Sequence, residues 1–303
     1  MRTTTNVRVI GVVRLMKILF SEQTCDEISR QVVRQTHRNV IRDDAARYDN
    51  EDHAVTDMWR EVLVNGHRDT PSSYLPGSPR CRMCLIPLGG VGGVLMKTRR
   101  GRSRSRKNPG MCNLRDDILP AGGAEIDITV MFADIRGSTS IAEKVGPAEF
   151  ANLLNRFYEV TTKSLLLQNA VVDKMIGGEV MAFFVPAFEK ETQAAALRAA
   201  VAILRRVGYR PGKEPWLPVG IGINFGEAYV GKVGTGEVND FTALGDTVNT
   251  AARLQSHAKA GEVVVSESVY SHIASEYPGV PKQEIELSGK NEPFGVHIIS
   301  FTE

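Results

Sequence analysis

Cysteine is scarce in this chain, and long hydrophobic runs are missing from it. Cys25, Cys81, Cys84 and Cys112 stand at uneven spacings among 303 residues, too few to form the disulfide framework of a small secreted domain. No stretch reaches the roughly 20 apolar residues that a membrane-spanning helix needs. The apolar run Val7–Phe20 is broken by three basic residues and precedes no small-residue cleavage site, so it does not fit a signal peptide. We therefore expect a cytoplasmic protein without a membrane span.

The distribution of charge divides the chain near Pro120. Residues 1–120 carry 21 basic and 13 acidic side chains, whereas the remainder carries 16 and 22. This shift suggests two units with different roles. We expect a poorly structured segment over residues 1–48, a small cysteine-containing regulatory module over residues 49–120, and a larger domain over residues 121–303.

The smaller module has one clear helical pattern and one basic tract. An amphipathic helix is expected between Asp49 and Val64, because apolar residues recur there at helical spacing: Val55, Met58, Trp59 and Val62. The run from Lys97 to Lys107 has seven basic residues and no acidic one. It contains no aromatic residue, so we interpret it as a solvated surface loop. A nucleic-acid partner is not favoured, and a nucleic-acid-responsive sensor is the weaker alternative.

The larger domain mixes strand-like and helical patterns. Two apolar runs flanking Gly177-Gly178 indicate a hairpin, and Ser140 with Glu143 matches a capping box at a helix start. Strands are expected at Ile126–Phe132, Ala170–Ile176, Val180–Val185, Val219–Asn224, Ala228–Gly231, near Val263 and at Val296–Phe301. Helices are expected after Pro147 and at Glu191–Val207, Thr247–His257 and Glu267–Ser275. The order predicts an α+β sandwich, a sheet with helices packed on one face.

Two segments carry residues suited to phosphate chemistry. Asp134 ends a strand and precedes a Gly-Ser-Thr turn into a helix, where a carboxylate can hold Mg²⁺ beside phosphates. Asn249 and Arg253 stand four residues apart, on one face of a predicted helix. Each pattern alone is also typical of an ordinary capped helix with solvated polar residues.

Four motifs appear in order: FADIRGST, VDKMIGGEVMAFF, VGIGINFGEAYVG and GDTVNTAAR. Together they resemble the class III adenylate and guanylate cyclases over roughly Glu125–Phe301. The resemblance implies a ferredoxin-like α/β sandwich over residues 121–303, preceded by a small irregular or helical cysteine-containing module. It also implies conversion of ATP to 3′,5′-cyclic AMP and pyrophosphate, for intracellular signalling.

The resemblance assigns roles to particular residues. Asp134 matches a metal ligand, with the backbone carbonyl of Ile135, for Mg²⁺ or Mn²⁺. Asn249 matches the residue that orients the ribose, and Arg253 the residue that stabilises charge on the α-phosphoryl group. Lys290 matches, less securely, a lysine that contacts the terminal phosphates. The family builds each site across a dimer interface, which implies a homodimer.

Base choice follows from hydrogen-bond complementarity. Lys174 can only donate a hydrogen bond and Thr242 can accept one, which fits the N1 acceptor and N6 donor of adenine. A guanylate cyclase is expected to carry Glu where this chain has Lys174. We therefore expect ATP as substrate.

The chain departs from the family at one metal position. The family motif Lys-x-Ile-Gly-Asp ends here in Gly178, so the second carboxylate is missing. Glu179 is adjacent, but alternation along a strand predicts that it points away unless the hairpin slips by one residue. Loss of even a group that only hydrogen-bonds to a metal ligand costs about 10–100-fold in metal affinity or activity. A weakened cyclase, an impaired heterodimer partner and an inactive nucleotide-binding homologue all remain open.

Three cysteines of the smaller module form a candidate second metal site. Cys81-x-x-Cys84 has metal-ligand spacing, and Cys112 follows 28 residues later. The segment resembles a Cys-rich region ahead of some bacterial cyclase domains, with Arg115 where a fourth cysteine would stand. Zinc or an iron–sulfur centre fits this pattern, with His67 or water as a further ligand. Unpaired free cysteines are an equally good interpretation.

Overall fold

The computed structural model describes residues 53–66, 74–82, 84–105, 108–113, 122–235, 238–290 and 292–301. The chain forms two compact units, Met1–Ala54 and Val55–Glu303. The first unit and the ends of several loops lie almost wholly outside the described residues. None of the described helices is long and apolar enough to cross a membrane.

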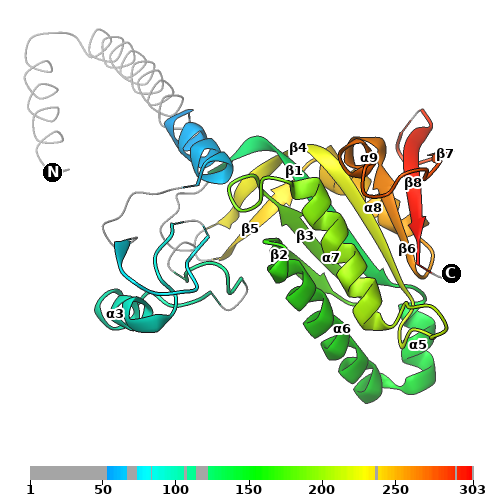
Figure 1. Cartoon of the computed structure of the whole chain (residues 1–303), viewed down its shortest axis with the longest axis horizontal. Coiled ribbons are helices and arrows are strands. Elements are labelled where there is room, and N and C mark those ends of the chain that lie inside the picture. Colours follow the sequence, from blue (N-terminus) through cyan, green and yellow to red (C-terminus); the bar gives the residue numbers. More distant parts are fainter. Residues whose placement is uncertain are drawn as a thin grey trace, which may run out of the picture. The chain divides into compact units, whose positions relative to one another are not determined.

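One eight-stranded sheet organises the second unit (Figure 1). Its order is β2-β3-β1-β4-β6-β8-β7, and β5 pairs with the extended end of β4. The pairing of β4 with β6 is parallel, and the other pairs are antiparallel. The strands are β1 (Gly122–Ile135), β2 (Val171–Ile176), β3 (Glu179–Phe184), β4 (Val219–Thr235), β5 (Val238–Leu244), β6 (Glu262–Ser266), β7 (Lys282–Ile285) and β8 (Phe294–Ser300).

The two faces of the sheet carry different cores, because side chains alternate along each strand. Met131, Ala133 and Ile135 of β1 pack against α6 (Pro147–Leu167), α7 (Thr192–Val207) and α9 (Glu267–Ile273). Val130 and Phe132 face the other way, toward α8 (Asp246–His257) and the cysteine-containing segment. The placement of α8 corrects the expectation that helices pack on one face only. Asp134 belongs by alternation to the face of α8.

The local signals were accurate for α6 and wrong for α5 (Ser138–Val145). Pro147 occupies the first turn of α6, where its fixed φ and missing N–H are tolerated. The N-cap of α5 is Gly137, at φ 67°, and no side chain caps the helix. The capping box at Ser140 and Glu143 is therefore wrong, because the left-handed turn at Gly137 places the N-cap three residues earlier.

The predicted strands and helices are otherwise confirmed, with two kinds of difference. The runs at Val219–Asn224 and Ala228–Gly231 form one 17-residue strand, β4, which passes through Gly226 without a break. The short strands β5 and β7 were not predicted. The pattern of β7, KQEI, is largely exposed, so it carries no alternation of apolar and polar residues to reveal it.

The segment before the sheet packs directly on it. A helix at residues 53–64 buries Trp59, Val62 and Leu63, and Trp59 stacks on Phe241 of β5 with centroids 5.9 Å apart. Of the four predicted apolar positions in this helix, Met58 is exposed.

The basic tract is not entirely a loop, because its first residues, from Lys97 onward, form the last turn of α3 (Gly90–Arg100). Buried Met96 anchors this helix, and Gly101 in the left-handed conformation ends it by donating its N–H to the carbonyl of Lys97.

Candidate functional site

Asp134 stands at the end of β1, where the strand leaves the sheet. Its carboxylate forms an ion pair with Arg136 and accepts a hydrogen bond of 3.3 Å from Nε2 of Gln255. The Asp134 side chain is 21% exposed, so it is reachable from solvent yet shielded enough for its charge to act strongly. The backbone N–H of Ile135 donates to the carbonyl of Gly178 at 3.0 Å, which holds the β2–β3 turn against this strand end.

The β2–β3 turn places Gly178 beside Asp134. A Cβ atom at Gly178 would lie 3.2 Å from Oδ1 of Asp134 and 3.2 Å from the Cβ atoms of Ile135 and Ser138. A side chain at position 178 would therefore point at the Asp134 carboxylate. A carboxylate at position 178 would therefore lie beside that of Asp134.

The prediction that Glu179 points away from Asp134 is wrong. Asp134 and Glu179 are direct cross-strand partners, and directly opposite residues of an antiparallel pair share a face. The alternation argument failed because Gly177, at φ 57°, belongs to the turn, so the strand pattern begins only at Glu179. The pKa of Glu179 is raised, first by burial and then by the negative charge of Asp134, while Arg136 opposes the shift.

Lys174 and Thr242 lie on neighbouring parts of the sheet. A bulge in β2 between Val172 and Lys174 leaves Asp173 buried, whereas Lys174 is exposed. The hydroxyl of Thr242, on β5, donates a 2.5 Å hydrogen bond to Oδ2 of Asp173. Because its proton is committed to Asp173, the Thr242 oxygen presents lone pairs to any further partner. Sequence reasoning missed Asp173, because its burial and its contact with Thr242 depend on the packing of β2 beside β5.

Asn249, Arg253 and Lys290 gather around the outer side of α8. Asn249 is exposed and Arg253 half-buried, four residues apart on one helix face. A Cβ atom at Gly289, next to Lys290 in the loop before β8, would lie 3.2 Å from Nη2 of Arg253. Nζ of Lys290 pairs with Oδ2 of Asp246, at the start of α8, at 2.6 Å.

Within one chain, the two halves of the predicted site point apart. Gln255 of α8 reaches Asp134, and Arg253 precedes Gln255 by two residues. Because successive helical residues are offset by about 100°, Arg253 projects about 160° away from Gln255. Asp134 and the Asn249–Arg253 pair therefore face different directions, and this chain alone does not bring them together.

The cysteines of the smaller segment do come together. Cys81, Cys84 and Cys112 are buried, and their sulfur atoms all lie within 4.8 Å of one another. The neighbouring sulfur atoms of Cys81 and Cys84, and then burial, raise the pKa of Cys112. The candidate ligand His67 and the position of Arg115 lie outside the described residues.

Comparison with known proteins gives the family. Residues 124–300 match the model of the adenylate and guanylate cyclase catalytic domain. This chain belongs to that family. Its cyclase domain is 28% identical to the adenylyl cyclase CyaB of P. aeruginosa, with a TM-score of 0.51 over 58% of this chain and 95% of that one. The guanylyl cyclase Cya2 matches with a TM-score of 0.51 and 25% identity, over 58% of this chain and 93% of the other.

Curated relatives extend the comparison. An adenylate cyclase of Anabaena cylindrica is 29% identical over 202 residues, 59% of this chain and 39% of its own length. A terminal-differentiation specific adenylate cyclase of Dictyostelium discoideum is 34% identical over 139 residues, 44% of this chain and 6% of its own length. The chain thus spans two fifths or less of these relatives.

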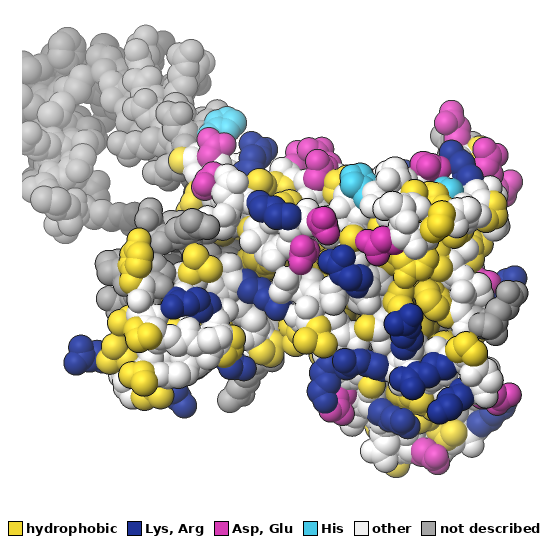
Figure 2. Space-filling view, viewed as in Figure 1, with side chains coloured by type: hydrophobic (Ala, Val, Ile, Leu, Met, Phe, Trp, Pro, Cys, Tyr) yellow, Lys and Arg dark blue, Asp and Glu magenta, His cyan; other side chains and the backbone are white. Residues whose placement is uncertain are grey.

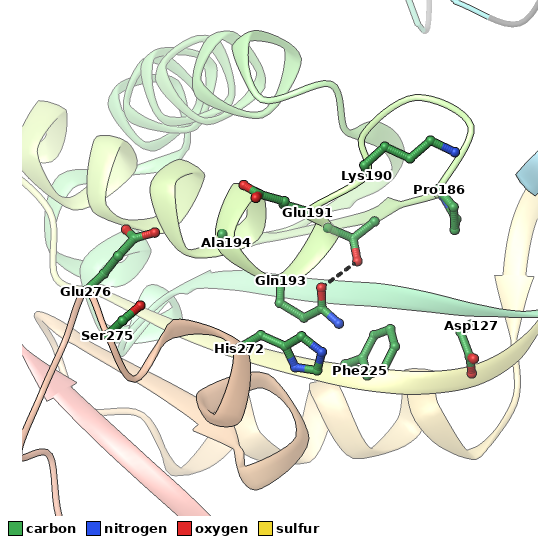
Figure 3. A pocket seen from close by; sticks show the side chains of 11 residues that line it. Asp127, Pro186, Lys190, Glu191, Gln193, Ala194, Phe225, His272, Ser275 and Glu276 are labelled. Atoms are coloured by element: carbon green, nitrogen blue, oxygen red, sulfur yellow. Dashed lines mark hydrogen bonds between the residues drawn. The ribbon is translucent and has the colours of Figure 1, made fainter. Parts of the chain in front are cut away.

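Two surface hollows of the cyclase domain lie on the side of the sheet covered by α7 and α9, away from Asp134. One, of about 430 Å³, opens between the start of α7 and α9, with Asp127 and Phe225 of the sheet as its floor (Figure 3). The other, of about 410 Å³, is lined by four arginines of α7 and the loop after it: Arg198, Arg205, Arg206 and Arg210. Lys and Arg side chains are prominent on this side of the molecule (Figure 2). None of the predicted site residues lines either hollow.

Proposed function

We propose that this chain is an adenylate cyclase that forms 3′,5′-cyclic AMP and pyrophosphate from ATP at a site shared by two chains. The observation that carries the proposal is the arrangement of α8. One side of the helix holds Gln255 against Asp134, and the other presents Asn249 and Arg253 outward. A complete set of metal-binding and phosphate-binding groups then requires a second copy, whose α8 faces the first chain's Asp134.

The Thr242–Asp173 hydrogen bond supports adenine over guanine. With its proton donated to Asp173 at 2.5 Å, the Thr242 oxygen can accept from the N6 amino group of adenine. The alternative acceptor for this proton, the carbonyl of Ala243, is farther, at 3.5 Å. The O6 atom of guanine would find no donor in that oxygen. Lys174, exposed at the bulge, can donate to adenine N1.

The oxygen donors around Asp134 fit a hard divalent cation. Asp134 and Glu179 share one face, and burial beside a like charge raises the Glu179 pKa, a strain that a cation relieves. Mg²⁺ or Mn²⁺ would be held by Asp134, the Ile135 carbonyl and Glu179, and when bound it would neutralise phosphate charge and lower the pKa of the ribose hydroxyl. We infer that Glu179 takes over part of the role of the carboxylate missing at Gly178.

The positively charged side chains of the protein would act on the phosphates of ATP. Arg253 would stabilise the charge that develops on the α-phosphoryl group during in-line attack by the 3′-hydroxyl, and Asn249 would orient the ribose. Lys290 would contact the terminal phosphates, and its Asp246 partner must then release it. Its 30% exposed side chain leaves room for that exchange.

Gly178 supports a second candidate, an inactive homologue or heterodimer partner that binds nucleotide without turning it over. The test is production of cyclic AMP and cyclic GMP by the purified full chain with ATP and with GTP, in Mg²⁺ and in Mn²⁺. We expect slow cyclic AMP formation that Asp134→Ala abolishes. Thr242→Val should raise the KM for ATP about tenfold or more, by loss of one acceptor, whereas Thr242→Ser should not. Absence of cyclic AMP under every condition, with nucleotide still bound, would favour the inactive homologue.

Mixing two inactive variants tests the shared site. Asp134→Ala removes the metal-binding half, and Arg253→Ala removes the phosphate-binding half. Because each heterodimer would contain one intact site, the mixture should recover activity toward about a quarter of the parent level, half of the dimers having one of two sites. Failure of the mixture to recover activity, with dimers present by sedimentation, would refute the shared site.

A further inference from the structure

The three cysteines of the smaller segment form a compact, buried cluster that the cyclase reaction does not use. Sγ of Cys84 and Sγ of Cys112 are 3.7 Å apart, and all three sulfur atoms lie within 4.8 Å of one another. A disulfide would need about 2.05 Å, so no disulfide joins these three cysteines.

The sulfur spacing fits a single tetrahedral ion. Zinc–sulfur bonds of about 2.3 Å at tetrahedral angles place neighbouring sulfur atoms about 3.8 Å apart. An iron–sulfur cluster divides three thiolates between at least two iron atoms and so holds some of them farther apart. The backbone N–H of Cys112 also donates to Sγ of Cys81 at 3.3 Å, which holds the two cysteines together.

The backbone around Cys81 and Cys84 is turned so that both sulfur atoms converge. The N–H of Leu85 donates to the carbonyl of Cys81, and the N–H of Cys81 donates to the carbonyl of Ile86, each at 2.8 Å. Leu85 has φ 57°, a left-handed conformation that residues with a side chain adopt only where the surroundings require it. The closed turn keeps Cys84 close to Cys81.

The turn that ends at Cys112 also contacts β2, the strand that carries Lys174. Asn108 is buried, and its side chain forms two hydrogen bonds with the backbone of Val172: Nδ2 donates to the carbonyl at 3.1 Å, and Oδ1 accepts from the N–H at 2.9 Å. The N–H of Met111 donates to the carbonyl of Asn108 at 2.8 Å, which ties that turn to Cys112. Val172 immediately precedes the bulge that carries Lys174.

We propose that Cys81, Cys84 and Cys112 bind one zinc ion, which holds the Asn108 turn in its contact with β2. Binding converts three thiols to thiolates and releases three protons to solvent. Three protein ligands leave the fourth tetrahedral position for water or another group. Removal of the ion loosens the Asn108 turn and, through Val172, the segment of β2 that carries the adenine-binding lysine of the proposed function.

Zinc content tests the site without any need for cyclase activity. The full chain, purified under reducing conditions and dialysed after loading with Zn²⁺, should retain about one zinc per chain by mass spectrometry of the metal. Cys84→Ser and Cys112→Ser should each lower the retained zinc at least about tenfold, whereas Asp134→Ala should not. Cys25→Ser is the matched control for loss of a cysteine, and circular dichroism checks that each variant is folded.

Cobalt binding is measured on the parent chain, so this test does not require any variant to fold. Co²⁺ in the parent chain should show the strong sulfur-to-metal charge-transfer absorption and tetrahedral visible bands of a thiolate site. A folded parent that retains no zinc and shows no such bands would overturn the proposal, as would zinc content that survives Cys84→Ser and Cys112→Ser.

Amide hydrogen exchange tests the contact with β2. With zinc bound, the Val171–Ile176 amides should exchange more slowly than after removal of zinc by a chelator. Asn108→Ala should speed exchange there while leaving zinc bound. Equal exchange with and without zinc would refute the link to β2, whatever the activity of the enzyme.

Discussion

Replacing Gly178 by Asp places a second carboxylate beside Asp134. The backbone of Gly178 does not lie in the left-handed region, so an Asp there meets no conformational penalty of that kind. Its Cβ would lie 3.2 Å from Asp134 Oδ1 and from the Cβ atoms of Ile135 and Ser138. Because these contacts are only slightly tight, shifts of a few tenths of an ångström can accommodate the new side chain.

The effect on stability should depend on the cation. Two negative charges roughly 4.5 Å apart repel by about 3–4 kcal/mol at an effective dielectric constant near 20. The ion pair of Asp134 with Arg136 offsets part of this, so we expect a loss of about 1–3 kcal/mol in the metal-free protein. For a unit of this size that corresponds to a fall in Tm of about 3–10 °C. Mg²⁺ or Mn²⁺ should reverse the fall.

Gly178→Asp should raise the rate of cyclic AMP formation, although it lowers the stability of the metal-free protein. A restored ligand should raise cyclic AMP formation at least about 10–100-fold over the parent, since loss of a mere outer partner costs that much. The assay is the initial rate with ATP at saturating Mg²⁺, together with melting curves with and without the cation. Gly178→Asn is the matched control, because it has nearly the same shape and no charge. The reasoning is refuted if Gly178→Asn activates as much as Gly178→Asp, or if Gly178→Asp binds the cation no better than the parent.

Two further predictions follow from the contacts described. Because its pKa is raised, Glu179 binds more protons in the folded than in the unfolded protein, so its contribution to stability falls as pH rises from the ordinary glutamate range through the raised pKa. Without metal, Glu179→Gln should therefore melt higher than the parent at neutral pH and lose this advantage below about pH 4; an equal difference at both pH values would contradict the assignment. Trp59 is fully buried against Phe241, so Trp59→Ala should lower the free energy of unfolding by about 3–5 kcal/mol. Trp59→Phe, which keeps the stack and removes an indole N–H without a hydrogen-bond partner among the described residues, should cost much less. Chemical denaturation measures the free energy of unfolding of both Trp59 variants. Equal losses would show that the stack on Phe241 does not contribute to stability.

Local sequence signals were sufficient for most of the fold. The Gly177-Gly178 hairpin, the helix start at Pro147 and the strand leading to Asp134 were predicted correctly, because each depends on short-range backbone preferences and on periodicity. The errors have the same origin. Ser140 has the right residue type for a helix cap but not the right position, and β7 lacks an apolar face that a pattern could reveal.

The sequence by itself determined the family and the identities of the residues suited to the chemistry. It also supplied the spacing of Cys81 and Cys84. The family, these residue identities and the cysteine spacing depend only on which residue types occur and in what order, and the sequence contains that information in full.

Only the tertiary structure decided how those residues face one another. Strand register, a long-range property, made Glu179 the partner of Asp134. The bulge in β2 and the pairing of β5 brought Asp173 to Thr242. Folding of the chain brought Cys112 to Cys84, which lies 28 positions earlier in the sequence. Such contacts depend on the packing of the whole sheet, and no local pattern specifies them.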